Sequence, residues 1–348
     1  MPPGRELAGS KDSLARRIGS HCQFRPHEIY PFRNVHDYNT EGNKLPPLAT
    51  SLTRRMKGKT GVEREPTALF KNIRLRRTGR FGGSRSPFWF GLWLTLFLLG
   101  VQAHAEDPVR IPAGSFQMGS LDGDREERPV HTVHVDSFYL DRYLVTNADY
   151  ARFLNLFGNQ KEGGEKWLDN VGPIASFLCK IRKEDGHFVP KRGYENHPVV
   201  KVSWYGARAY ARWLGKRLPT EAEWEKAARG NLEGKKYVYG DTISIEQANV
   251  GGFHATTPVG SYPPNGFGLY DMVASVWQWC SDWYDPEYYS RSPARNPHGP
   301  ESGSEKVLRG GSWFHNDSWR VSARISDDPL SKSFCFVTGF RCAKDDDK

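Results

Sequence analysis

The sequence has little of what a membrane span, a repeat array or a metal-binding motif requires. Its longest apolar run, from Pro87 to Val101, is shorter than the roughly 20 residues that a membrane-spanning helix needs. No internal repeat is visible. Three histidines of the C-terminal half, His254, His298 and His315, are candidate metal ligands, and they show neither H-x-H nor H-x-x-x-H spacing. These absences exclude a repeat protein and any ready-made histidine metal motif in that half.

Positive charge is concentrated at one end of the chain. Residues 1–105 contain 18 Lys and Arg against 7 Asp and Glu, whereas residues 106–348 contain 31 against 33. The net charge of +9 therefore does not indicate nucleic-acid binding, which requires a basic face on the folded domain. Residues 1–86 show no sustained helical or strand period, and we expect a basic extension that is disordered or mis-assigned.

Residues 87–105 have the features of an export signal. The apolar run is followed by Ala103-His104-Ala105, which matches the A-x-A pattern of a signal-peptidase site before Glu106. We therefore expect an exported protein, periplasmic or secreted, whose true start lies near residues 70–80. The alternative is an uncleaved signal anchor, in which only residues 87–101 contact the membrane.

Residues 106–348 are numerous enough for one large domain, and they contain nine of the eleven tryptophans. Many Gly and Pro residues separate short segments, which predicts an irregular, loop-rich α+β fold. Capping residues and hydrophobic periodicity predict three helices and two strands. The helices are expected over 147–157, over 204–214 and from Thr220 to Arg229, and the strands over 116–118 and 130–140.

Several ordered motifs extend from about residue 109 to 344. The most specific is Val307–Trp313 (VLRGGSW), followed by Arg324 and by Gly339–Cys342 (GFRC). The earlier motifs are Ile111–Ser120, Arg217–Glu225, Pro263–Met272 and the pair Trp277/Trp279. This set resembles the formylglycine-generating enzyme, or sulfatase-modifying factor, family. The resemblance implies a C-type-lectin-like domain with a small central antiparallel sheet, two main helices and much irregular structure.

The resemblance also exposes a missing reactive pair. In the enzymes of this family, two cysteines follow the Gly-Gly-Ser turn, and a copper ion uses their thiolates to activate oxygen. Here the two positions fall at His315 and at about Arg320, and neither side chain supplies a thiolate. His315 and Ser312 remain the candidate catalytic residues, and a bound copper or iron ion remains open.

We expect the ligand pocket of the family to survive around the Gly310-Gly311 turn. Two arginines there favour an anionic or carboxylate-bearing ligand. Alternatives are a buried structural ion pair for Arg324 and a solvated or hydrogen-bonded loop histidine for His315. The expected lining is Trp277, Arg309, Ser312, Trp313, His315 and Arg324.

The resemblance implies weak calcium binding at two places. In the first set, Gln278 replaces a carboxylate of the family with a neutral amide, which lowers the expected affinity. The second set is followed by the loop 251–257, which contains no acidic residue. The first set is Asp271, Ala274, Val276 and Gln278, and the second begins with Asn249 and Val250.

Four cysteines follow the expected cleavage site: Cys179, Cys280, Cys335 and Cys342. An even number in an oxidising compartment predicts one or two disulfides, with three complete pairings open. Cys335 and Cys342 are close enough in sequence to close a small loop. The resemblance implies a disulfide at Cys342, although the usual partner position holds Ala227 or Ala228.

Two functions stay open. The first is a divergent metal-dependent oxidoreductase or maturation factor that acts on an exported protein, a peptide or a small molecule. The second is a noncatalytic ligand- or peptide-binding module on the same lectin-like fold. The missing thiolates argue against formylglycine generation in both cases.

Overall fold

Strands from distant parts of the chain form the central sheet of the domain. The structure, a computed structural model, describes residues 108–346 apart from 172, 251–254, 314–317 and 331–336. Four strands pair in the order β11-β10-β9-β12; β10 is antiparallel to both neighbours, and β12 is parallel to β9. They are β9 (Trp277–Trp283), β10 (Lys306–Arg309), β11 (Arg324–Asp327) and β12 (Thr338–Gly339).

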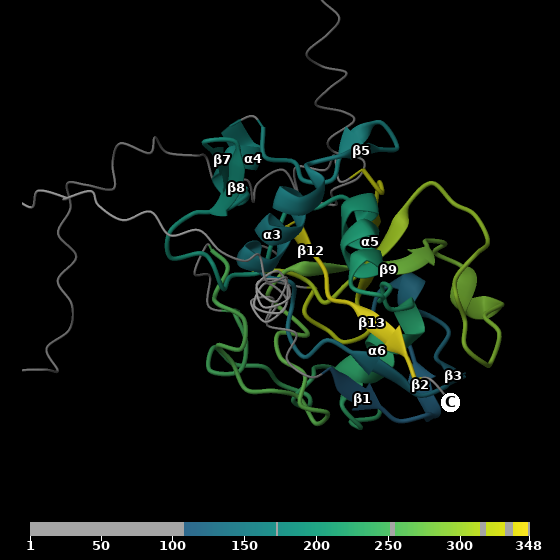
Figure 1. Cartoon of the computed structure of the whole chain (residues 1–348). Coiled ribbons are helices and arrows are strands. Elements are labelled where there is room, and N and C mark those ends of the chain that lie inside the picture. Colours follow the sequence, from purple (N-terminus) through teal and green to yellow (C-terminus); the bar gives the residue numbers. More distant parts are fainter. Residues whose placement is uncertain (1–107, 172, 251–254, 314–317, 331–336, 347–348) are drawn as a thin grey trace, which may run out of the picture. The chain divides into compact units, whose positions relative to one another are not determined.

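A second sheet joins the two ends of the domain. Its order is β1-β4-β13, with antiparallel pairing throughout, so the last strand lies against one of the first (Figure 1). Its strands are β1 (Val109–Ile111), β4 (Phe138–Leu140) and β13 (Ala343–Asp345). All described residues belong to one compact unit, residues 94–348. The predicted extension 1–86 and signal 87–105 lie outside the described residues.

Among the described residues, three two-stranded hairpins and two short 3-10 helices complete the strand-and-turn part of the fold. The predicted strand 130–140 is two strands, because Asp136 and Ser137 separate β3, which pairs with β2, from β4, which pairs with β1 and β13. The hairpins are β2 (Gly114–Met118) with β3 (His131–Val135), β5 (Lys161–Glu162) with β6 (Glu165–Lys166), and β7 (Ile181–Glu184) with β8 (His187–Pro190). The 3-10 helices are η2 (Arg125–Glu127) and η3 (Tyr288–Ser290).

The three predicted helices are confirmed, and their N-termini are capped as expected. The hydroxyl oxygens of Thr146 and Ser203 each accept a hydrogen bond from the first turn, and Thr220 with Glu223 forms the capping box. The second helix ends at Trp213, so Leu214 is its C-cap. The helices are α3 (Asn147–Phe157), the short α4 (Pro173–Leu178), α5 (Trp204–Trp213) and α6 (Glu221–Arg229). No helix in the described part of the chain is long and apolar enough to cross a membrane.

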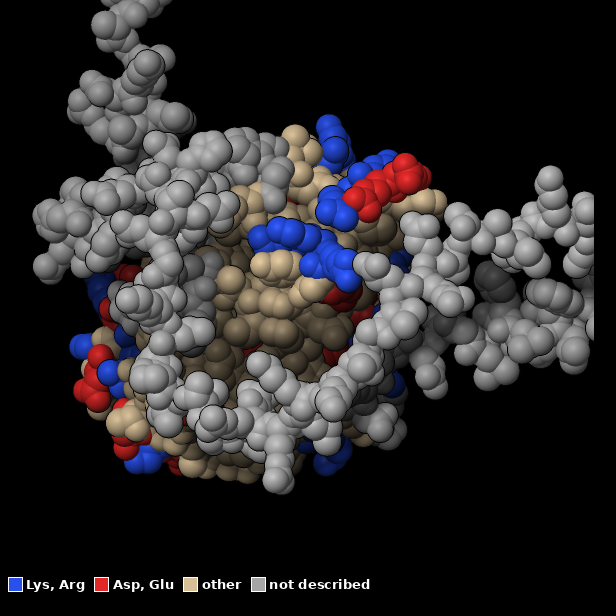
Figure 2. Space-filling view, turned by 90° about the vertical axis from the view of Figure 1, so that its left-hand side faces the viewer, with Lys and Arg blue, Asp and Glu red and all other residues tan. Residues whose placement is uncertain are grey.

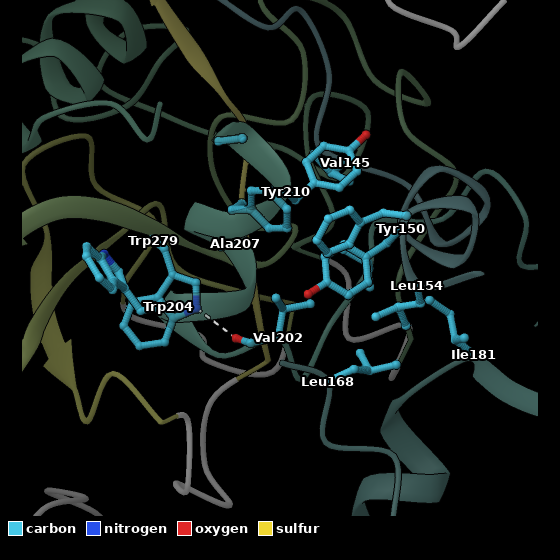
Figure 3. Packing of buried hydrophobic residues seen from close by; sticks show 14 of the residues in the cluster. Val145, Tyr150, Leu154, Leu168, Ile181, Val202, Trp204, Ala207, Tyr210 and Trp279 are labelled. Carbon is cyan, nitrogen blue, oxygen red and sulfur yellow. Dashed lines mark hydrogen bonds between the residues drawn. The ribbon is translucent and has the colours of Figure 1, made fainter. Parts of the chain in front are cut away.

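Aromatic side chains connect α3 and α5 to the central sheet. Tyr150 of α3 and Tyr210 of α5 lie 5.7 Å apart between ring centroids, and both rings contact Phe340. The Trp279 indole N–H, on β9, donates to the Val202 carbonyl oxygen at 2.9 Å (Figure 3). Each buried ring removes a large apolar area from water, which explains the tryptophan-rich composition of the domain.

The described cysteines correct the disulfide prediction. Cys179, Cys280 and Cys342 are free, buried thiols, and Cys335 lies outside the described residues. Burial raises the pKa of the Cys179 thiol to about 11, and its sulfur lies 3.5 Å from the Ile181 carbonyl oxygen. Each thiol packs as a small apolar side chain. The number and spacing of the cysteines predicted disulfides, but the fold does not bring these three sulfur atoms together.

Candidate functional site

The Gly310-Gly311 turn ends β10 and directs the chain towards Ser312. Both glycines have positive φ angles, +94° and +66°, which disfavour any other residue. A Cβ on Gly310 would lie 2.6 Å from the Met272 carbonyl oxygen, and one on Gly311 2.4 Å from that of Ser318. The turn therefore needs glycine at both positions in order to pack three segments of backbone together.

The central sheet brings the predicted pocket residues together as part of the core. Arg309 on β10 lies in register with Arg324 on β11 and with Gln278 on β9. His315 lies outside the described residues. The five described members do not line an open cleft, because none is more than 7% exposed. They are Trp277, Arg309, Ser312, Trp313 and Arg324.

Arg324 forms the buried ion pair that was the alternative to a ligand-binding role. Its Nε and Nη2 atoms donate to the two carboxylate oxygens of Glu221 at 2.7 and 2.8 Å. Its remaining nitrogen donates to the carbonyl oxygens of Glu126 and Asp285, and its guanidinium lies 4.4 Å from the centroid of Tyr289. The group is fully occupied, and it fixes β11 to the start of α6.

Arg309 forms a second buried pair with α6. It pairs with Glu225, and it also donates to the carbonyl oxygens of Val321, Ser322 and Ala323. Burial alone would raise the pKa of Glu225, but the guanidinium groups of Arg229 and Arg309 hold it below its usual value. The carboxylate is therefore charged inside the protein and serves as a structural counter-ion.

Arg320, at the second of the missing thiol positions, belongs to a third ion pair. Its Nη2 atom donates to the carboxylates of Asp124 and Glu127, and the Glu127 side chain is only 1% exposed. The Glu127 carboxylate also accepts from the backbone N–H of Asp124 at 3.1 Å. Arg320, near which the resemblance predicts the second thiol position, is thus integrated into the packing between η2 and the segment before β11.

The acidic partners of these arginines were missed from the sequence. Glu221 and Glu225 are one helical turn apart within the motif Arg217–Glu225, so the sequence predicts that they lie on the same face of the helix. Arginine inside the otherwise apolar Val307–Trp313 run was the second signal, since a buried guanidinium requires a carboxylate. Neither signal identifies which acid pairs with which arginine.

The first predicted calcium set does not fit the ion. Gln278 uses its whole amide: Nε2 donates to the carbonyl oxygens of Asp271 and Met272, and Oε1 accepts from Trp224 and Arg341. The Asp271 carboxylate accepts from the Gly260 N–H, and burial raises the pKa of Asp271 to about 6. Two of the four predicted ligands, Asp271 and Gln278, therefore have other partners, and Ala274 and Val276 would supply only neutral backbone carbonyl oxygens.

The second set is different, because it contains an unused acceptor. The Asn249 side-chain oxygen is buried and has no hydrogen-bond partner among the described residues, while its Nδ2 donates to the Ala255 carbonyl oxygen. Such an orphaned oxygen fits a cation ligand. Next to it is Val250, and residues 251–254 lie outside the described part of the chain. Nowhere among the described residues do three or more His, Cys, Asp or Glu side chains gather as a metal site.

Comparison with known proteins agrees with this geometry. Residues 99–346 match the model of the sulfatase-modifying factor enzyme 1-like domain. The chain is 41% identical to the formylglycine-generating enzyme of Streptomyces coelicolor, over 69% of this chain and 89% of that protein. It is 33% identical to the mouse inactive C-alpha-formylglycine-generating enzyme 2, over 74% and 96%.

A solved structure confirms the fold as mixed α+β and loop-rich. PvdO from Pseudomonas aeruginosa superimposes with a TM-score of 0.51 at 27% identity, covering 68% of this chain and 93% of that one. The ordered motifs, the matching domain model and this similarity agree over the same part of the chain. The protein belongs to the sulfatase-modifying factor family.

Proposed function

We propose that this family member is a noncatalytic ligand-binding module that keeps the fold without the thiol chemistry. The observation that carries the proposal is Arg320, which stands at the second thiol position and pairs with Glu127 and Asp124. A guanidinium held in this way neither ligates copper nor supplies an electron-rich sulfur. The buried pairs of Arg309 and Arg324 add support, because both arginines act as counter-ions inside the domain.

The ligand would be an exported protein, a peptide or a small molecule. The mouse relative is named as an inactive formylglycine-generating enzyme, so the family includes a protein that is described as having lost the activity. We propose export on the strength of the Ala103-His104-Ala105 site, with the mature chain beginning at Glu106. N-terminal sequencing of the protein expressed from its own gene tests this, and a cytoplasmic product that retains residues 1–105 would contradict it.

Calcium, if held, belongs at Asn249 and Val250. The orphaned Asn249 oxygen supports this placement, and the lack of a nearby acid in the sequence of the following loop implies weak affinity. Thermal unfolding with added calcium or with a chelator tests it. The melting temperature of wild type should rise with calcium, and that of Asn249→Ala should not respond.

A divergent metal-dependent oxidoreductase or maturation factor is the second candidate. The 41% identity to a formylglycine-generating enzyme favours it. In that case His315 and Ser312 are the candidate catalytic residues, and a copper or iron ion would need ligands from beyond the described part of the chain.

The proposal is tested with a cysteine-containing peptide of the sulfatase type. Wild type should leave its thiol unchanged with or without copper, as measured by mass spectrometry. A His315→Cys/Arg320→Cys double variant is the matched control, because it restores both sulfur positions and shows whether the assay detects any gain. Copper-dependent conversion of the peptide by wild type would overturn the proposal.

A further inference from the structure

A cavity unconnected with the Gly-Gly-Ser turn lies between the end of α3, the β5–β6 hairpin and the β7–β8 hairpin. Its volume is about 540 Å³, and its lining shares no residue with the predicted pocket or calcium sets. A space of that size is typical of small-molecule sites, which occupy roughly 300–1,000 Å³. The cavity therefore needs its own explanation.

The lining of this cavity carries charge of one sign only. Five basic residues and no acidic residue contribute to it among the described residues. Figure 2 looks at the side of the molecule with the β7–β8 hairpin, where blue side chains gather in the upper part with a red group beside them. The basic residues are Lys166, Lys180, Arg182, Lys183 and Lys191.

Most of these cations lack a carboxylate partner among the described residues. Arg182 pairs with Glu184, but both side chains are about half exposed, so the pair contributes little. Lys180 and Lys191 both lie over the ring of Tyr194, at 5.0 and 5.5 Å from its centroid. The aromatic ring holds two ammonium groups near each other without neutralising either of them.

Two acidic side chains near the lining have partners, one of them in the lining itself and one outside it. Glu184 pairs with Arg182, and Asp169 lies 3.5 Å from the Lys201 ammonium group. Burial, followed by repulsion from Lys191, lowers the pKa of Lys180. An unneutralised group of like charges in a concave surface raises the local concentration of anions.

The floor of the cavity is apolar. Ile181 and Phe188 are buried there beside the Cys179 thiol, and Val171 at the edge is 69% exposed. A ligand that fills the space would place an apolar or planar body against this floor and its anionic groups against the lysines. A fully solvated inorganic anion would contact the lysines but not the apolar floor.

We propose that this cavity binds a small organic polyanion, such as a phosphorylated or sulfated metabolite or saccharide. Lys180 and Lys191 hold the anionic groups, and the floor formed by Ile181 and Phe188 accepts the organic part. The inference goes beyond the noncatalytic function proposed above and holds whether or not the domain retains a reaction.

The test is isothermal titration of the protein with three probes: inorganic pyrophosphate, adenosine triphosphate without metal, and a trisulfated heparin disaccharide. At least one organic probe should bind more tightly than pyrophosphate. Affinity should fall at least about tenfold in a Lys180→Gln/Lys191→Gln variant, since the loss of a single charge-assisted contact of roughly 1.5 kcal/mol already corresponds to about tenfold.

The matched control is Lys235→Gln/Lys236→Gln, which removes the same charge from exposed lysines outside the cavity lining. Its affinity should stay within about twofold of wild type, and thermal melting should confirm that both variants fold. Equal loss in the two variants would show non-specific electrostatics, and absence of binding by all three probes would overturn the proposal. Preference for the nucleotide or for the disaccharide distinguishes phosphate from sulfate ligands. Peptide conversion does not enter this test, so its outcome is independent of the first proposal.

Discussion

Replacing Arg324 with alanine should destabilise the domain strongly. The guanidinium makes two hydrogen bonds of 2.7 and 2.8 Å to Glu221 and two more to backbone carbonyl oxygens. Its removal leaves the Glu221 carboxylate, which is 3% exposed, beside Asp282 and with only the more distant Arg309, at 3.9 Å, as a counter-ion. Breaking one partner of such a pair costs about 3–5 kcal/mol. For a domain of this size, the melting temperature should fall by roughly 6–20 °C.

Urea unfolding of four proteins measures this contribution: wild type, Arg324→Ala, Glu221→Gln and the double variant. The double variant should be less destabilised than the sum of the singles, with a coupling of about 0.5–3 kcal/mol, because it removes both charges of the Arg324–Glu221 pair and leaves neither partner without the other. A loss of less than about 1 kcal/mol in Arg324→Ala would refute the reasoning, since that is the range of an exposed pair.

Three further substitutions probe other parts of the site. Burial, followed by repulsion from Glu221, raises the pKa of Asp282 to about 7, so its protonation stabilises the fold at low pH, and this contribution is lost as the pH rises through 7. The stability of Asp282→Asn relative to wild type should therefore increase between about pH 5 and pH 8 in urea titrations, and a constant difference would contradict this. Gln278→Glu should destabilise the protein by about 1–3 kcal/mol by removing two N–H donors, and added calcium should recover part of that loss; a variant as stable as wild type without calcium would disprove the contribution of those donors. Gly310→Ala should cost more stability than Gly186→Ala, because both have positive φ but only the first meets a backbone oxygen; equal melting temperatures would argue against that contact.

Local chemistry made the helices predictable. Thr146, Ser203 and Thr220 cap the helices that follow them, and each cap depends on residues within one turn of the chain. The break at Asp136 in the strand 130–140 was missed, because alternation continues on both sides of it while the two halves pair with different sheets.

The site could be predicted only in part, because its state depends on partners far away in the sequence. The Gly310-Gly311 turn and the loss of both thiols are visible in the sequence itself. The burial of Arg309 is not, since Glu225 lies 84 residues earlier. The cysteine count likewise predicted disulfides, but it contained no information on which thiols meet in space, and Cys280 is enclosed by apolar neighbours instead.

Metal analysis of the purified protein tests the central claim most directly. The claim is that the site has lost its reactive centre, and a peptide assay examines only one substrate, whereas metal content reports on the centre whatever the substrate is. Protein purified without chelators and analysed by mass spectrometry for copper and iron should contain far less than one atom of either per chain. One tightly held copper or iron ion per chain would contradict the account and favour a catalytic function.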